Sequence, residues 1–165
     1  MKKNSRLFFY LLVILLFLNG CNSHEATQNE DLFQYKNTYV GDNGAVGNIT
    51  RELPSPDGEQ LNSLELKTTE QPYGIILNYI PAEKREGIER NYKELALFNA
   101  TLILSLVHNA DWVAFHFVEQ EFVVKREELQ NFYGIDINQF TNEEELTMFI
   151  QEFLEDDHKV NEFYQ

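Results

Sequence analysis

Residues 95–107 read LALFNATLILSLV, and this stretch decides the fold. Leu95, Leu102 and Leu106 share one side of a helix with 3.6 residues per turn, and apolar side chains occupy most of the remaining circumference. The stretch is too short to cross a bilayer, which takes about 20 helical residues. We therefore predict a buried core helix that opens near Pro81. Asn99 falls within its apolar stripe and needs a hydrogen-bond partner there.

The sequence predicts one hairpin before this helix and one hairpin after it along the chain. Residues 63–69 alternate between apolar and polar side chains, and residues 73–80 are rich in β-branched and aromatic side chains. The segment 70–72 between them has the composition of a hairpin turn. Residues 112–118 and 122–125 form the second predicted pair, with a turn at Gln120 and Glu121. The expected fold class is α+β, with two antiparallel hairpins in one sheet packed on the central helix.

Short helices flank this predicted core. Residues 46–53 suit an amphipathic helix that Asp42 or Asn43 could cap and that ends before Pro54. Residues 126–133 suit another, stopped by Gly134 in a left-handed conformation. For the last helix we predict Thr141 as the N-cap and Glu144 as its capping-box partner, followed by an apolar stripe at Leu146, Phe149, Ile150, Phe153 and Leu154. The predicted order is αββαββαα, in a single domain over residues 31–165.

The composition limits the classes of partner. The chain has 165 residues, with 27 acidic and 13 basic side chains and a net charge of −14. Phosphate binding needs clustered Lys and Arg, so we expect no nucleic-acid partner. A basic envelope protein or peptide suits this charge better. The single cysteine excludes an intrachain disulfide and a cysteine-rich zinc site.

The amino terminus has the pattern of an export signal. Lys2, Lys3 and Arg6 precede an unbroken apolar run at residues 7–18, which has the length of a signal-peptide core. The next residues, LNGC at positions 18–21, resemble the lipobox of bacterial lipoproteins. This resemblance implies a signal peptide at residues 1–20, a lipid on Cys21, and a polar tether at residues 21–30. The protein would then be anchored by lipid to the outer face of the cell membrane, since two acyl chains anchor durably.

Two further stretches suggest a family. Residues 32–43 read LFQYKNTYVGDN, and WVAFHF at 112–117 is followed by REEL at 126–129 and by Tyr133-Gly134. Together they resemble an uncharacterised extracytoplasmic domain of Gram-positive bacteria, found in small lipoproteins and attached to membrane sensor-type peptidases. The resemblance covers about residues 31–155. It implies an extracytoplasmic location and favours sensing or regulation, and it carries no established activity.

Catalytic signatures are missing from the sequence. It contains no G-x-S-x-G, H-E-x-x-H, phosphate-loop or G-x-G-x-x-G motif. His108 at the end of the core helix suits the helix dipole, and His116 suits a packed position on a strand. The DNG at residues 42–44 and the Asp136-x-Asn138 pair resemble fragments of a calcium loop without its twelve-residue ligand pattern. We expect no catalytic residue, metal or cofactor.

Six residues are the candidates for binding a partner. Exposed aromatic side chains and special turn residues often form binding surfaces, and the candidates are Tyr35, Tyr39, Asp42, Asn43, Trp112 and His116. The structural alternative is that Tyr39 packs on the sheet and the glycines serve only backbone geometry.

The leading hypothesis is a lipid-anchored, extracytoplasmic module that binds, senses or regulates without catalysis. One alternative is a small cell-envelope hydrolase that uses His116 or His108 with a carboxylate. A transporter's substrate-binding lipoprotein is another, although 145 residues after the signal peptide is short for a two-lobed clamp. An immunity or sequestration role also remains open.

Overall fold

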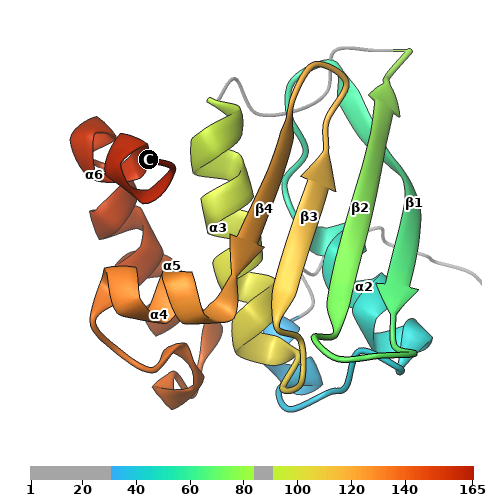
Figure 1. Cartoon of the computed structure of the whole chain (residues 1–165), viewed down its shortest axis with the longest axis horizontal. Coiled ribbons are helices and arrows are strands. Elements are labelled where there is room, and N and C mark those ends of the chain that lie inside the picture. Colours follow the sequence, from blue (N-terminus) through green and yellow to red (C-terminus); the bar gives the residue numbers. More distant parts are fainter. Residues whose placement is uncertain (1–30, 84–90) are drawn as a thin grey trace, which may run out of the picture.

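Helix α3 (Tyr92–Leu106) is the centre of the structure, a computed structural model that describes residues 31–83 and 91–165 (Figure 1). Every side chain from Leu95 to Leu106 is buried, which confirms the predicted core helix. The Asn91 side chain caps the helix by accepting a hydrogen bond from the Lys93 amide at 2.9 Å. The predicted start near Pro81 is wrong, because Pro81 still belongs to a strand and pairs with Glu59.

Four strands form one sheet in the order β1-β2-β3-β4. They are β1 (Glu59–Lys67), β2 (Gly74–Pro81), β3 (Trp112–His116) and β4 (Glu121–Lys125). The pairs β1–β2 and β3–β4 are antiparallel, as predicted for two hairpins. The central pair β2–β3 is parallel, so the sheet is mixed and the expectation of a purely antiparallel arrangement is corrected.

The parallel pair follows from the position of α3 in the chain. Two parallel neighbours need a crossover connection, usually a helix, because the chain must return to the end from which it started. Helix α3 lies between β2 and β3 in sequence and packs on the sheet through β3 and β4. The chain therefore enters β3 beside the start of β2, with Gly74 opposite Trp112.

The two faces of the sheet differ in their surroundings. One face carries the buried side chains of Ile75, Leu77, Val113, Phe115 and Val124, which join those of α3 in one apolar cluster. The opposite face is turned toward the viewer in Figure 1, where none of the described helices lies across the strands. Within the core, Asn99 Nδ2 donates to the Pro54 carbonyl at 3.0 Å, whereas the buried Asn99 Oδ1 has no hydrogen-bond partner among the described residues.

Short helical elements surround this centre. They are η1 (Leu32–Tyr35), α2 (Asn43–Glu52), α4 (Arg126–Tyr133), η2 (Ile137–Gln139), α5 (Glu143–Leu154) and α6 (Asp157–Phe163). Asp42 caps α2 by accepting from the Ala45 amide at 3.0 Å, and Gly134 ends α4 at φ 70°. Both local predictions are confirmed.

Two predictions about the C-terminal region are corrected. The N-cap of α5 is Asn142, whose Oδ1 accepts from the Glu145 amide at 2.9 Å, and not Thr141. Helix α6 is absent from the predicted order, because Val160 is its one buried residue and no apolar stripe marks it. The predicted signal peptide, Cys21 and the polar tether lie outside the described residues.

Candidate functional site: a tryptophan pocket on the open sheet face

The uncovered side of the sheet presents three rows of side chains, which we call the open sheet face. Strand register places each row across all four strands. The rows are Lys67–Gly74–Trp112–Lys125, Glu65–Ile76–Ala114–Val123 and Ser63–Asn78–His116–Glu121. The middle row is apolar on three strands, and Val123 is 53% exposed. Ala114 in the same row is only 3% exposed, so the exposed apolar surface of this row lies mainly at Val123, and charged side chains occupy the outer strands.

Trp112 is held flat on the backbone of the neighbouring strand. A Cβ atom added at Gly74 would lie 2.1 Å from Trp112 Cε2, so only glycine leaves room for the indole there. The indole Nε1 donates to the Pro72 carbonyl at 3.1 Å. The ring thus has one side against Gly74 and the other turned away from the sheet. A large aromatic side chain fixed in this way is suited to binding because little conformational entropy remains to be lost.

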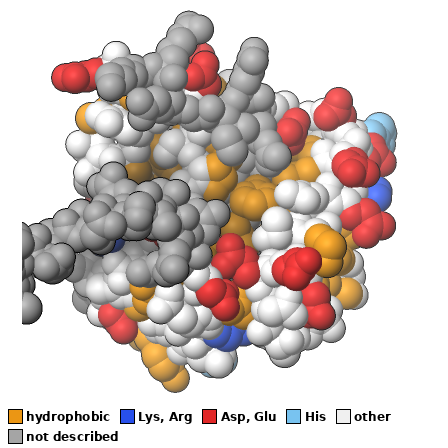
Figure 2. Space-filling view, turned by 180° about the vertical axis from the view of Figure 1, so that it is seen from behind, with side chains coloured by type: hydrophobic (Ala, Val, Ile, Leu, Met, Phe, Trp, Pro, Cys, Tyr) orange, Lys and Arg blue, Asp and Glu red, His pale blue; other side chains and the backbone are white. Residues whose placement is uncertain are grey.

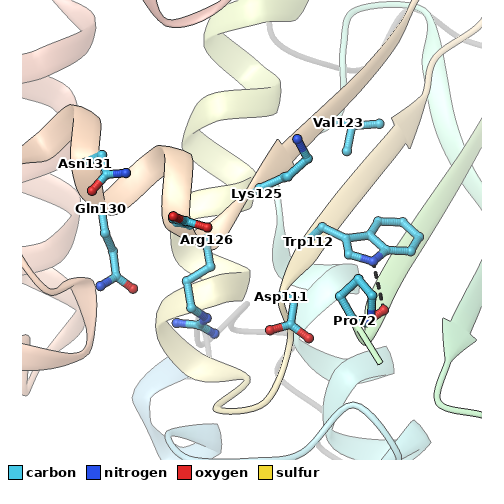
Figure 3. A pocket seen from close by; sticks show the side chains of 9 residues that line it. Pro72, Asp111, Trp112, Val123, Lys125, Arg126, Gln130 and Asn131 are labelled. Atoms are coloured by element: carbon cyan, nitrogen blue, oxygen red, sulfur yellow. Dashed lines mark hydrogen bonds between the residues drawn. The ribbon is translucent and has the colours of Figure 1, made fainter. Parts of the chain in front are cut away.

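Beside Trp112 is an open pocket of about 850 Å³. Its walls come from the turn before β2, the start of β3, strand β4 and the exposed side of α4 (Figure 3). The lining residues are Pro72, Asp111, Trp112, Val123, Lys125, Arg126, Glu127, Gln130 and Asn131. Such a mixture of apolar surface and a few polar groups is typical of ligand-binding sites.

Arg126 fixes the floor of this pocket to the core. Its Nε and Nη2 donate to the carbonyls of Ala110 and Val107, each at 2.8 Å, and Nη1 approaches Asn138 Oδ1 at 3.4 Å. Its backbone amide also donates to the Asp111 carbonyl at 2.8 Å. Burial lowers the pKa of the Arg126 guanidinium below its ordinary value, while the carboxylates of Asp111 and Asp136 act in the opposite direction. The guanidinium is therefore committed to protein acceptors.

The other charged side chains of the pocket differ in whether they have a hydrogen-bond or ion-pair partner. Lys125 Nζ contacts Glu128 Oε1 at 2.6 Å, although both side chains are more than half exposed. Asp111 Oδ2 accepts from the Tyr73 amide at 2.7 Å, which ties the start of β3 to the turn before β2. Glu127 lies in the first turn of α4 and is exposed. Of the pocket's charged side chains, Glu127 has no hydrogen bond or ion pair among the described residues.

His116 lies in another row of the open sheet face, where Asn78 bridges it to Ser63. His116 Nδ1 is 2.9 Å from Asn78 Oδ1, and Asn78 Nδ2 donates to Ser63 Oγ at 3.2 Å. An amide thus stands between the histidine and the hydroxyl, so the geometry brings no nucleophile to His116. Among the described residues, no group of three or more His, Cys, Asp or Glu side chains could hold a metal ion.

An ion pair within strand β1 adjoins this row. Lys67 Nζ contacts Glu65 Oε2 at 2.8 Å, and Asn78 Nδ2 lies 3.4 Å from Glu65 Oε1. The hydrogen bond and the charge of Lys67 lower the pKa of the Glu65 carboxyl below its ordinary value. Both side chains are about half exposed, so this network orders the surface more than it stabilises the fold.

The four N-terminal candidates have mainly structural positions. Asp42 caps α2, and Asn43 is the first residue of that helix. The Tyr35 hydroxyl accepts from Asn48 Nδ2 at 3.0 Å. Tyr39 is 59% exposed and meets His108 edge-on, with 5.9 Å between ring centroids. Trp112 is the one candidate among the six that lines the pocket.

The same N-terminal segment closes the C-terminal end of α3. Lys36 Nζ donates to the Ser105 carbonyl at 2.8 Å, and the His108 amide donates to the Thr38 carbonyl at 2.8 Å. A cation there also interacts favourably with the negative end of the helix dipole. Burial lowers the pKa of the Lys36 ammonium below its ordinary value. The segment thus serves the fold by closing the end of α3, although Tyr39 lies against His108 and not, as the structural alternative expected, on the sheet.

Comparison with known families now places the chain. Residues 32–130 match the family described as Domain of unknown function (DUF4825). The chain belongs to the DUF4825 family. The matched region contains the whole open sheet face and every pocket-lining residue except Asn131, whereas α5 and α6 lie beyond it. The pocket is thus almost entirely part of the DUF4825 domain.

Two other comparisons found nothing: no curated protein and no solved structure matches the chain significantly. The described helices include none with the length and apolarity needed to cross a bilayer.

Sequence reasoning about this DUF4825 domain missed most of the pocket. Asp111, Arg126, Glu127, Gln130 and Asn131 were not candidates, because nothing local distinguishes them from ordinary surface residues. One signal was available: a glycine that opens a strand marks a close approach by another group. Gly74 meets that description, but the sequence does not say which group approaches.

Proposed function

We propose that this DUF4825 protein is a lipid-anchored, extracytoplasmic binding module without catalytic activity, and that its ligand site is the Trp112 pocket. The observation that carries the proposal is Trp112 held against Gly74 beside an open pocket of about 850 Å³. The ring is exposed toward the pocket side and anchored through its Nε1. Polar groups on α4 line another side of the same pocket, as expected for a site that orients a ligand (Figure 3).

The geometry supports binding better than hydrolysis. His116 contacts the Asn78 amide and His108 contacts the Tyr39 ring, and among the described residues no hydrogen bond joins either histidine to a carboxylate, a hydroxyl or a thiol. General base catalysis needs the base within hydrogen-bond reach of the group it activates. A binding or regulatory role requires only the pocket.

Anchoring rests on the lipobox-like LNGC sequence at residues 18–21. Cys21→Ser removes the thiol that would accept the lipid, so this variant should lose lipid labelling and accumulate as unprocessed precursor. Metabolic labelling with a clickable fatty acid measures this directly. Normal labelling of the variant would contradict the anchoring.

The ligand site is tested by site-specific photo-crosslinking in the full-length protein in its native membrane. A photoreactive amino acid at Asn131, on the rim of the pocket, should give a specific adduct. The adduct should disappear when Trp112→Ala is added. The matched control places the same group at Met148 on α5, which is 56% exposed. Identical adducts from both positions, or adducts indifferent to Trp112→Ala, would contradict a site at the pocket.

A further inference from the structure

We propose that the Trp112 pocket binds a cationic side chain, the ammonium or guanidinium of a basic peptide segment. This inference rests on the proposed function and gives the chemistry of its ligand. Three features of the described residues support it: committed cations, an available carboxylate and an aromatic face.

The cations of the pocket already have partners. The Arg126 guanidinium donates to the carbonyls of Ala110 and Val107 at 2.8 Å, and these bonds hold it in the pocket floor. Lys125 Nζ is 2.6 Å from Glu128 Oε1. An anionic ligand would have to compete with these contacts, and displacing Arg126 would leave the Ala110 carbonyl without this donor and the Val107 carbonyl with only the Ala110 amide at 3.3 Å.

The pocket's carboxylates, unlike its cations, are available to bind a ligand. Glu127 extends from the first turn of α4 into the pocket lining and has no ion pair or hydrogen bond within residues 31–83 and 91–165. Asp111 uses Oδ2 for the Tyr73 amide and adds a second carboxylate to the lining. A cation placed between these groups would gain charge-assisted hydrogen bonds.

Trp112 supplies the surface on which such a cation can rest. Because its indole lies on Gly74, the ring face opposite the sheet is turned outward. Tryptophan is the best aromatic partner for a Lys or Arg side chain, which also lays its aliphatic part along apolar surface. Pro72 and Val123 provide that surface beside the ring. The side-chain amides of Gln130 and Asn131 can hydrogen-bond to a peptide backbone.

The charge of the whole domain acts in the same direction. The described ranges contain 23 acidic and 7 basic side chains. Acidic side chains are scattered over the face seen from behind, where few basic side chains are visible (Figure 2). Such a field draws cationic partners toward the molecule and repels anionic polymers. The negative charge of the domain would raise the local concentration of cationic partners, and the pocket would then select among them.

The test uses defined peptides and the fluorescence of Trp112, the one tryptophan of the chain. The probe is an acetylated and amidated octapeptide of alternating Gly and Lys. Octapeptides with Gln or Glu in place of Lys are the matched controls, and chitohexaose tests for a neutral glycan. We expect saturable binding of the Lys peptide that weakens with added salt, and no binding of the Glu peptide.

Two variants with the same change in net charge distinguish binding at the pocket from attraction by the overall negative charge of the domain. Glu127→Gln should weaken binding of the Lys peptide about threefold. Glu152→Gln, at an exposed acid on α5, changes the net charge equally and should leave affinity unchanged. Equal effects of the two variants, or no binding of the Lys peptide, would overturn the inference. Equal affinity for the Gln peptide, or preferential binding of chitohexaose, would overturn it too but would leave the pocket as a binding site. The photo-crosslinking at Asn131 tests whether the pocket is a binding site, independently of the chemistry of the ligand.

Discussion

Gly74→Ala is the sharpest single test of how the pocket is built. In an ordinary strand, replacing glycine by alanine stabilises by roughly 0.5–1 kcal/mol, because the unfolded chain loses freedom. Here the new methyl group would lie 2.1, 2.3 and 2.4 Å from three atoms of the Trp112 indole. The ring would have to move by at least about 1 Å to reach ordinary carbon–carbon contact.

The structure gives the size and the sign of the effect. Moving the ring breaks the Trp112 Nε1 bond to the Pro72 carbonyl, a loss of about 1 kcal/mol. Exposing on the order of 50 Å² of apolar surface removes about 1.3 kcal/mol more. After the intrinsic gain from alanine, the free energy of unfolding should fall by about 1–2 kcal/mol. A substitution that usually stabilises should therefore destabilise this domain.

The assay is urea unfolding followed by far-ultraviolet circular dichroism, with tryptophan emission recorded in the absence of denaturant. Gly74→Ala should lower the unfolding midpoint and shift the emission of Trp112, and it should weaken binding of the Lys peptide. The matched control is Gly41→Ala, because nothing lies within 4 Å of a Cβ built at Gly41. Unchanged emission with equal or greater stability in Gly74→Ala would refute the seating of Trp112 on Gly74.

Four further variants, in three experiments, test other parts of the structure by urea unfolding. Arg126→Met keeps the apolar stem but removes the Arg126 donor from the Ala110 carbonyl and leaves the Val107 carbonyl only the Ala110 amide at 3.3 Å, so it should cost about 1–3 kcal/mol; a loss well below about 1 kcal/mol would contradict the anchoring role. Asn142→Ala should cost about 1 kcal/mol and Thr141→Ala almost nothing; the reverse order would restore Thr141 as the cap. The third experiment compares the wild type with Tyr92→Phe. It tests the hydrogen bond that the Tyr92 hydroxyl donates to the Glu59 carboxylate, which raises the pKa of Tyr92 to about 12. Because the unfolded chain loses this proton near pH 10, wild-type stability should fall between pH 10 and 12, and its advantage over Tyr92→Phe should narrow there; an advantage that stays constant would count against the bond.

Local patterns in the sequence predicted several elements correctly. The apolar stretch at 95–107 predicted the buried helix α3, and alternation predicted both hairpins. Gly134 was assigned correctly as the stop of α4, and Asp42 was one of the two predicted caps of α2, because both act on amides or dihedral angles within a few residues. The predicted cap Thr141 was wrong, because the adjacent Asn142 caps α5 and both side chains can accept from a helical amide.

The sequence by itself thus determined most of the helices and strands, though not α6, and which helix is buried, because these depend on periodicities within one segment. It also supplied the lipobox-like pattern at residues 18–21, a linear motif. Only the tertiary structure decided that β2 and β3 run parallel and that one face of the sheet stays open. That register brings Trp112 onto Gly74 and Arg126 under the pocket. Gly74 and Trp112 are separated in the sequence by the whole of α3. No local pattern could therefore show that the Trp112 indole packs where a Cβ atom of residue 74 would lie.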